Sequence, residues 1–301
     1  MEKLHFAVAL PSQNEYQRMQ AANAVEAGNQ LGIEVSVFYA DSDAIQQSQQ
    51  VLDLIQRSKN KPDGILLEPL TAVGLERAAQ AAHDAGIGWV VLNADVDYVP
   101  RLRQAGKAPI FVVTRDHIEI GRVQGRQFVA LLPGGGSVLY IQGPANSSAA
   151  AQRTTGMEST KPASIHIKTL RSQWNEADAY KTISAWLRLP TNRAADFNLV
   201  GCQYDGIAMG ARRAFEEHEN HEERIRWLAL PLSGVDGLPT QGKAWVKQGL
   251  LTATVEAPTT TQLGVRLLEQ AIRTGKSPAE RTLIDVHSYP GLDELTPRAT
   301  R

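Results

Sequence analysis

Polar and aromatic side chains follow several of the strand-like apolar runs of this chain, and they carry its candidate chemistry. The residues concerned are Ser12, Gln13, Asn14, Tyr16, Asn93, Asp95, Trp174, Asn175, Tyr204, Asp205, Asp236 and Glu256. Amides and carboxylates can each bond two adjacent hydroxyl groups, and an aromatic ring can cover the C–H face of a sugar. Asparagine and aspartate also follow strands as turn formers and helix caps, so each position has a structural alternative. The set as a whole indicates a site for a small molecule rich in hydroxyl groups.

Patterns typical of enzymes and metal sites do not fit the chain. Gly134–Gly136 precedes a strand-like run, whereas a phosphate loop precedes a helix and carries a lysine, so we interpret it as a turn. The histidines and glutamates of His218–Glu222 lie in a charged helix end, and their spacing differs from that of zinc hydrolases. The sequence contains no serine elbow and no evident pairing of a histidine with a nucleophile. We therefore expect a binding protein rather than an enzyme, with no cofactor and no metal.

Short apolar runs separated by helical patterns must position the candidate residues. The first runs are Leu4–Leu10, Ile33–Tyr39, Gly64–Glu68 and Gly88–Asn93. The segments between them carry apolar stripes at helical spacing and are long enough for crossover helices. This alternation predicts a doubly wound parallel sheet with helices on both faces. In such sheets, ligands bind outside the carboxyl ends of the strands, where the candidate residues lie.

From about Ile110 the pattern repeats, which predicts a second unit of the same α/β class. Its strands are expected at Ile110–Val113, Ser137–Ile141, Ser164–Leu170, Asn198–Cys202, Arg226–Leu232 and Thr252–Val255. Tyr98–Pro109 is polar and reads as a connection between the units. The helix Thr260–Thr274 and the strand Thr282–Val286 have no partners of their own, so they must join one of the two sheets.

The charge balance, the cysteine content and the length of the apolar stretches restrict the classes of partner that we expect. The 31 Lys and Arg residues nearly cancel 32 Asp and Glu residues, which removes the basic field that nonspecific nucleic-acid binding requires. The single cysteine, Cys202, lies in an apolar run and is interpreted as a small buried side chain. Apolar stretches of about eight residues fall short of the roughly twenty that span a bilayer. We expect no nucleic-acid partner and a monomer that is not embedded in a membrane.

Only Met1–Lys3 precede the first apolar run, which leaves no room for a secretory signal or a helix-turn-helix. Two locations follow from this. The protein is periplasmic if its signal is missing from this sequence, and cytoplasmic if Met1 is the native start.

Four segments resemble those of periplasmic sugar-binding proteins of the ribose-binding type, relatives of lactose-repressor-type sensor domains. These segments are Gln142–Ala150, Asp205–Ala211, Gly234–Gly237 and Thr252–Val255, and Asp116–Arg122 also resembles the entry to the second lobe of that family. The resemblance runs in order from about Leu4 to Asp285. It implies two lobes joined by a hinge of several strands, with a ligand cleft between them. The expected lobes are residues 1–113 with 257–283 and residues 114–256 with 284–301.

The resemblance also implies roles for particular residues. Asp236 would be the carboxylate that bonds sugar hydroxyls, Asn93 would fill an acidic position, and Trp174 would supply the stacking ring. Gln13, Asn14 and Tyr16 would line the wall of the first lobe, and Glu256 lies near a glutamine-type ligand contact.

The chain departs from the family pattern at two positions. Ala151 stands where the family usually places a ligand-binding arginine, and Tyr204 stands where an asparagine normally precedes Asp205. Arg153 is expected to point elsewhere on its helix. Arg115, at the crossing between the units, could supply the missing cation, but an exposed hinge arginine is the favoured interpretation. These departures predict a ligand other than an ordinary pentose or hexose, with Tyr204 among the residues that line its site.

Together these features favour a solute-binding protein. It would capture a small carbohydrate or polyol by closure of its lobes and deliver it to an ABC-type transporter, a membrane permease or a sensor. The alternative is the ligand-sensing domain of a lactose-repressor-like transcription regulator without its DNA-binding domain.

Overall fold

The computed structural model describes residues 3–56, 59–71, 74–189, 192 and 196–297. Within them the chain divides into two compact units, which we call unit 1 and unit 2. Unit 1 comprises Met1–Arg115 and Thr259–Ile284, and unit 2 comprises Asp116–Pro258 and Asp285–Arg301. The chain therefore passes from one unit to the other three times, after Arg115, Pro258 and Ile284. The sequence had placed these crossings after residues 113, 256 and 283.

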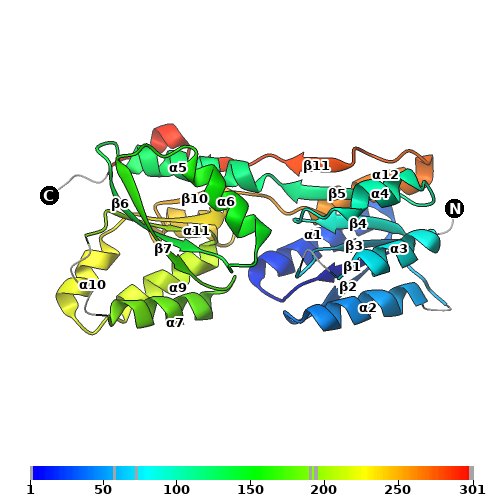
Figure 1. Ribbon diagram of the computed structural model, residues 1–301, viewed down its shortest axis with the longest axis horizontal. Coiled ribbons are helices and arrows are strands. Elements are labelled where there is room, and N and C mark those ends of the chain that lie inside the picture. Colours follow the sequence, from blue (N-terminus) through cyan, green and yellow to red (C-terminus); the bar gives the residue numbers. More distant parts are fainter. Residues whose placement is uncertain (1–2, 57–58, 72–73, 190–191, 193–195, 298–301) are drawn as a thin grey trace. The chain divides into compact units, whose positions relative to one another are not determined.

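Unit 1 is built on a parallel sheet with the strand order β11-β5-β4-β3-β1-β2 (Figure 1). Its strands are β1 (His5–Leu10), β2 (Glu34–Tyr39), β3 (Gly64–Leu67), β4 (Gly88–Leu92), β5 (Ile110–Arg115) and β11 (Arg281–Ile284). Its helices are α1 (Glu15–Leu31), α2 (Ala44–Gln56), α3 (Glu76–Asp84), α4 (Tyr98–Gln104) and α12 (Thr261–Thr274). The late strand β11 pairs with β5 at the sheet edge, which confirms that it joins an earlier sheet.

Alternation along each strand explains why both faces of this sheet need helices. In β1, Phe6, Val8 and Leu10 pack into one apolar cluster, and Ala7 and Ala9 pack into another on the opposite face. Residues of α1 and α12 complete the first cluster, and residues of α2, α3 and α4 complete the second. A strand buried on both faces is apolar throughout, as the sequence showed.

Unit 2 repeats this architecture, with the strand order β12-β10-β9-β8-β6-β7. Its strands are β6 (Gly136–Gln142), β7 (Ile165–Arg171), β8 (Leu199–Cys202), β9 (Leu232–Asp236), β10 (Ala253–Glu256) and β12 (His287–Tyr289). In the described part of unit 2, β12 runs antiparallel to β10 and the other neighbouring strands are parallel. Its helices are α5 (His117–Leu131), α6 (Ser148–Glu158), α7 (Glu176–Leu187), α9 (Asp205–Glu216), α10 (His221–Leu228) and α11 (Gly242–Lys247), and a 3-10 helix follows at Leu292–Glu294. The predicted α/β class with two parallel-sheet lobes is confirmed.

Two sequence interpretations of secondary structure were wrong. The segment expected as a strand at Arg226–Leu232 holds the end of α10, and β9 begins only at Leu232. Asn220 starts this helix because its side chain accepts a hydrogen bond from the Glu223 amide at 3.0 Å. Tyr98–Pro109 does not connect the two units, because both α4 and the strand β5 at Ile110–Arg115 belong to unit 1, where Tyr98, Val99 and Leu102 bury one face of α4.

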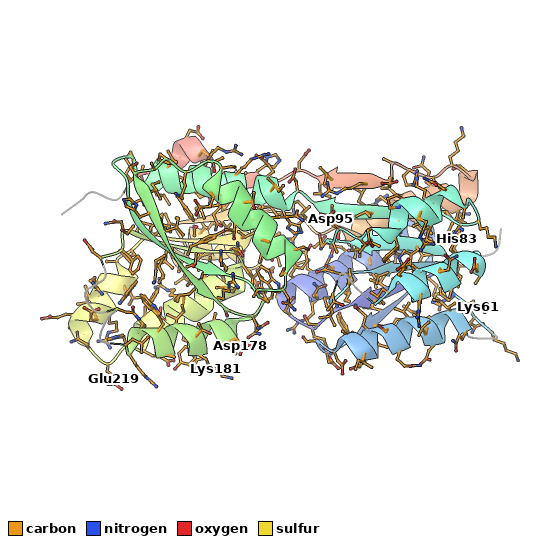
Figure 2. The ribbon with its side chains drawn as sticks, viewed as in Figure 1. Lys61, His83, Asp95, Asp178, Lys181 and Glu219 are labelled. Carbon is orange, nitrogen blue, oxygen red and sulfur yellow. The ribbon has the colours of Figure 1, made fainter. Side chains whose placement is uncertain are left out.

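The charged segment His218–Glu222 lies between α9 and the first turn of α10. Glu219, His221 and Glu222 are exposed, which confirms the interpretation of a solvated helix end (Figure 2). Among the described residues, no helix is both long and apolar enough to cross a membrane.

Candidate binding sites at the carboxyl ends of the two sheets

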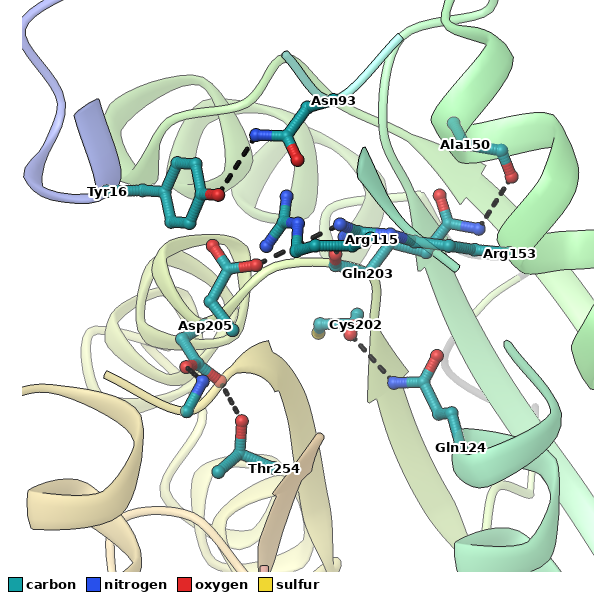
Figure 3. A network of polar contacts seen from close by, with 12 residues as sticks. Tyr16, Asn93, Arg115, Gln124, Ala150, Arg153, Cys202, Gln203, Asp205 and Thr254 are labelled. Atoms are coloured by element: carbon teal, nitrogen blue, oxygen red, sulfur yellow. Dashed lines mark hydrogen bonds and ion pairs between the residues drawn. The ribbon is translucent and has the colours of Figure 1, made fainter. Parts of the chain in front are cut away.

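In unit 1, two of the predicted residues meet at the carboxyl ends of the strands. Tyr16 lies in the first turn of α1 and Asn93 follows β4, and the Asn93 amide nitrogen donates to the Tyr16 hydroxyl at 3.0 Å (Figure 3). Both side chains are buried. The backbone of Asn93 has a φ of 53°, a left-handed conformation that asparagine tolerates better than most residues. This turn directs the Asn93 side chain toward α1.

Glu68, which the sequence interpretation did not select, is the charged centre of this group. It follows β3 and accepts hydrogen bonds from the side-chain amides of Gln17 at 2.9 Å, Gln20 at 3.2 Å and Asn93 at 2.7 Å. Burial raises the pKa of the Glu68 carboxyl above its usual range, against the lowering effect of these amides and of the Arg115 charge. Its three amide donors make Glu68 the most extensively bonded carboxylate described in unit 1.

Arg115 is not the exposed hinge residue that the sequence indicated. It is only 5% exposed, and its guanidinium carbon lies 4.3 Å from the centre of the Tyr16 ring. A guanidinium over an aromatic face is attracted by the negative face of the ring. Arg115 therefore supplies a positive charge to the same group as Glu68.

Asn14 and Gln13, which were expected to line the wall of unit 1, have structural partners. Asn14 caps α1, because its side-chain oxygen accepts a hydrogen bond from the Gln17 amide at 2.9 Å. Gln13 is exposed and donates to Asp41 at 3.2 Å. Of the three predicted residues Gln13, Asn14 and Tyr16, the described side-chain hydrogen bonds therefore join only Tyr16 to Asn93 and Glu68.

In unit 2, Asp236 ends β9 and lies beside a guanidinium. Its carboxylate is 3.9 Å from Arg153, and the two side chains are 5% and 4% exposed. Asp236 has a φ of 117°, and Gly237 follows at 60°. Such a conformation costs a residue with a side chain on the order of 1–3 kcal/mol, and strain of this kind is concentrated at functional sites. The surrounding structure holds Asp236 in this position.

Helix phase explains why the prediction for Arg153 was wrong. Residues two apart on a helix point about 200° apart, so Ala151 is exposed while Arg153 is buried. The Arg153 guanidinium donates to the backbone carbonyl of Gln203. A cation is therefore present in this group, although Ala151 occupies the position where one was expected.

Trp174 follows β7 and completes the group. The Arg153 guanidinium carbon lies 5.4 Å from the centre of the Trp174 ring. The ring also packs on the backbone of Gly143, where a Cβ atom would lie 2.2 Å from it. Glycine at position 143 is therefore required for the indole to lie where it does.

Asp205 supports the strand end that carries Asp236. Its carboxyl oxygens accept hydrogen bonds from the Thr254 hydroxyl at 2.7 Å and from the Gly237 amide at 2.8 Å (Figure 3). Burial raises the pKa of Asp205 well above its usual range, and the nearby Asp236 charge adds to this shift. The buried Asp205 carboxyl therefore fixes the turn at Gly237.

Gln203 is a second residue that the sequence interpretation missed. Its side chain accepts from the Gly143 amide at 3.0 Å and donates to the Ala150 carbonyl at 2.9 Å (Figure 3). It thus ties the loop after β6 to α6. A polar residue directly after the apolar run that ends at Cys202 was the available signal.

Tyr204 and Glu256 have other side-chain surroundings in unit 2. Tyr204 is buried in the apolar cluster of unit 2 that includes Ile207 and Ala208. Glu256 pairs with Lys243 at 2.5 Å and is partly exposed. The described contacts of unit 2 therefore join Asp236 and Trp174 through Arg153, and Glu256 lies beside Asp236 in the β9–β10 pair with its carboxylate on Lys243.

Comparisons with known proteins agree with this architecture. The ribose import binding protein RbsB of Escherichia coli K12 is 26% identical over 249 residues, covering 82% of this chain and 76% of that protein. A xylitol-binding protein of Mycolicibacterium smegmatis is 25% identical over 213 residues, covering 70% of this chain and 55% of that protein.

Solved structures show the same fold. A solute-binding protein from Actinobacillus succinogenes with bound D-allose superposes with a TM-score of 0.81 at 20% identity, covering 95% of this chain and 97% of that one. The Caulobacter myo-inositol binding protein superposes with a TM-score of 0.77 at 19% identity, covering 95% and 92%. A family model described as the periplasmic binding protein domain matches residues 6–277, and the chain belongs to that family as a protein of the ribose-binding type.

Proposed function

We propose that this protein is a periplasmic solute-binding protein that captures a small carbohydrate or polyol and delivers it to an ABC-type transporter or a sensor. In this proposal both units contribute polar groups to one ligand and close on it. A ligand that binds the closed form more tightly shifts the population toward that form. The partner would then recognise the loaded protein by its conformation.

The observation that carries the proposal is the group formed by Asp236, Arg153 and Trp174. A buried carboxylate can accept hydrogen bonds from two hydroxyls, a guanidinium can donate to others, and an indole can cover the apolar face of a ring. Asp236 ends β9, Arg153 lies in α6 and Trp174 follows β7, yet the Arg153 guanidinium lies close to both of the other side chains. This combination suits a molecule with several hydroxyl groups and a C–H surface.

The balance of charges supports a neutral ligand. In unit 1 the Glu68 carboxyl lies in the field of Arg115, and in unit 2 the Asp236 carboxylate lies beside Arg153. The third carboxyl, Asp205, has a raised pKa, which favours its neutral form. A charged ligand would need an excess of the opposite charge, which these groups do not offer.

The relatives support the same class of ligand. The proteins reported above are named for, or solved with, ribose, xylitol, D-allose and myo-inositol. Each of these molecules is uncharged and carries several hydroxyl groups.

Isothermal titration calorimetry with D-ribose, xylitol, D-allose and myo-inositol tests the proposal. At least one should bind, and Asp236→Asn should then weaken binding about tenfold to a hundredfold, because a hydrogen bond to a charged group contributes about 1.5–3 kcal/mol. Asp53→Asn, which alters an exposed carboxylate on α2, is the control and should leave affinity unchanged. Binding of amino acids in place of all four compounds would contradict the proposal.

A further inference from the structure

We propose that Glu68 is the carboxylate with which unit 1 contacts the ligand, and that Asn93 is its neutral neighbour. This inference rests on the proposed function. It assigns a ligand contact to a residue that follows β3, whereas the sequence pattern directed attention to the residue that follows β4.

Glu68 is held in place without being fully enclosed. Three side-chain amides fix it, two from α1 and one from Asn93, and the residue is partly exposed. A carboxylate whose rotamer is fixed before the ligand arrives loses little conformational freedom on binding. Glu68 is therefore a rigid acceptor on a residue that is in part exposed at the strand ends.

The hydrogen bonds to described residues leave one acceptor position on the Glu68 carboxylate. Oε2 accepts from both Gln20 and Asn93, whereas Oε1 accepts from Gln17 alone among the described residues. Each carboxylate oxygen can accept about two hydrogen bonds. Oε1 can therefore accept one further bond, and a ligand hydroxyl is a suitable donor.

The amide of Asn93 explains why the charge belongs on Glu68. Its nitrogen donates to Glu68 at 2.7 Å and to the Tyr16 hydroxyl at 3.0 Å. An aspartate at position 93 would bring two carboxylates to hydrogen-bond distance, where both cannot ionise together. Asparagine keeps the pair at a single negative charge, which Arg115 balances.

The test uses calorimetry and thermal unfolding with D-ribose, xylitol, D-allose and myo-inositol as probes. Glu68→Gln should weaken binding of whichever probe the wild-type protein binds by about tenfold or more. Glu76→Gln is the control, because Glu76 is an exposed carboxylate on α3 that pairs with Arg101, and it should leave affinity unchanged.

A double variant separates ligand contact from local support. Glu68→Gln with Asn93→Asp exchanges the acid and the amide and restores an acid–amide pair. If Glu68 contacts the ligand, the double variant should recover the melting temperature lost in Asn93→Asp alone, while its affinity stays low because the carboxylate lies at the other position.

Two results would overturn the inference while leaving the proposed function intact. The first is wild-type affinity in Glu68→Gln, and the second is full recovery of affinity in the double variant. Failure of the wild-type protein to bind any probe would overturn the proposed function and this assignment together.

Discussion

Replacing Arg153 with methionine should destabilise unit 2 and weaken ligand binding. Methionine keeps most of the side-chain length but removes the charge that faces Asp236 and the donor to the Gln203 carbonyl. Asp236 would then lose the cation beside it while only 5% exposed, and Asp205 would lose a charge that lowers its pKa. The substitution therefore acts on both buried carboxyl groups of unit 2.

The structure sets the size of the effect. Removing one partner of a buried ion pair costs about 3–5 kcal/mol. The separation of 3.9 Å between Arg153 and Asp236 is long for a direct pair, so we expect the lower end of that range, about 3 kcal/mol. An exposed pair contributes at most about 1 kcal/mol. Arg122→Met is the matched control, because Arg122 is 46% exposed and pairs with Glu119 at 3.4 Å.

Urea unfolding followed by tryptophan fluorescence measures this difference. Four of the five tryptophans, Trp174, Trp186, Trp227 and Trp245, belong to unit 2, so the signal reports mainly on that unit. The free energy of unfolding should fall by about 3 kcal/mol in Arg153→Met and by less than about 1 kcal/mol in Arg122→Met. Equal losses in the two variants would refute the assignment of Arg153 to a buried charge group.

Three further predictions concern other parts of the chain. The folded-state pKa of Asp205 lies above its unfolded value, so its contribution to stability is present at low pH and is lost as pH rises between the two values. Asp205→Asn should remove this slope, at most about 1.4 kcal/mol per pH unit, from unfolding free energies measured from pH 4 to 8, and parallel curves for the two proteins would contradict it. Trp174→Leu should weaken ligand binding in calorimetry and abolish the change in fluorescence on ligand addition, and an unchanged fluorescence response would place the reporter elsewhere. His83, on α3, is fully buried, and its ring nitrogens have no hydrogen-bond partner among the described residues (Figure 2), so His83→Leu should raise the free energy of unfolding by about 1 kcal/mol, whereas a loss on urea titration would show that the ring packs better than leucine.

The fold could be predicted largely from the sequence because its strands are buried on both faces. Continuous apolar runs such as Phe6–Leu10 and Gly88–Leu92 have few alternatives in an α/β chain. The exception was Trp227–Leu230, whose apolar composition resembles a strand although it lies at and just after the end of α10. The capping residue Asn220 was the local signal for a helix, but the apolar run that follows it is more typical of a strand.

The candidate sites could be predicted only in part, because their contacts are formed between distant segments. Asp236 and Trp174 could be selected as polar or aromatic residues after strands. Glu68 could not be, since its role depends on amides contributed by α1 and by the end of β4. The direction of the Arg153 side chain depends on the phase of its helix, because residues two positions apart lie on nearly opposite faces.

The late position of α12 and β11 in the chain has a consequence for synthesis on the ribosome. Unit 1 has five of its strands once Arg115 has been added, but β11 ends only at Ile284, about 170 residues later. At about 5–20 residues per second, this delay lasts roughly ten to thirty seconds. Throughout it the β5 edge lacks its partner, and Leu66 and Val90 lack the cover that Leu268 and its neighbours supply. The strands β6–β10 of unit 2 are all made within that interval, so the unit that begins second can assemble its central sheet before the first one is complete.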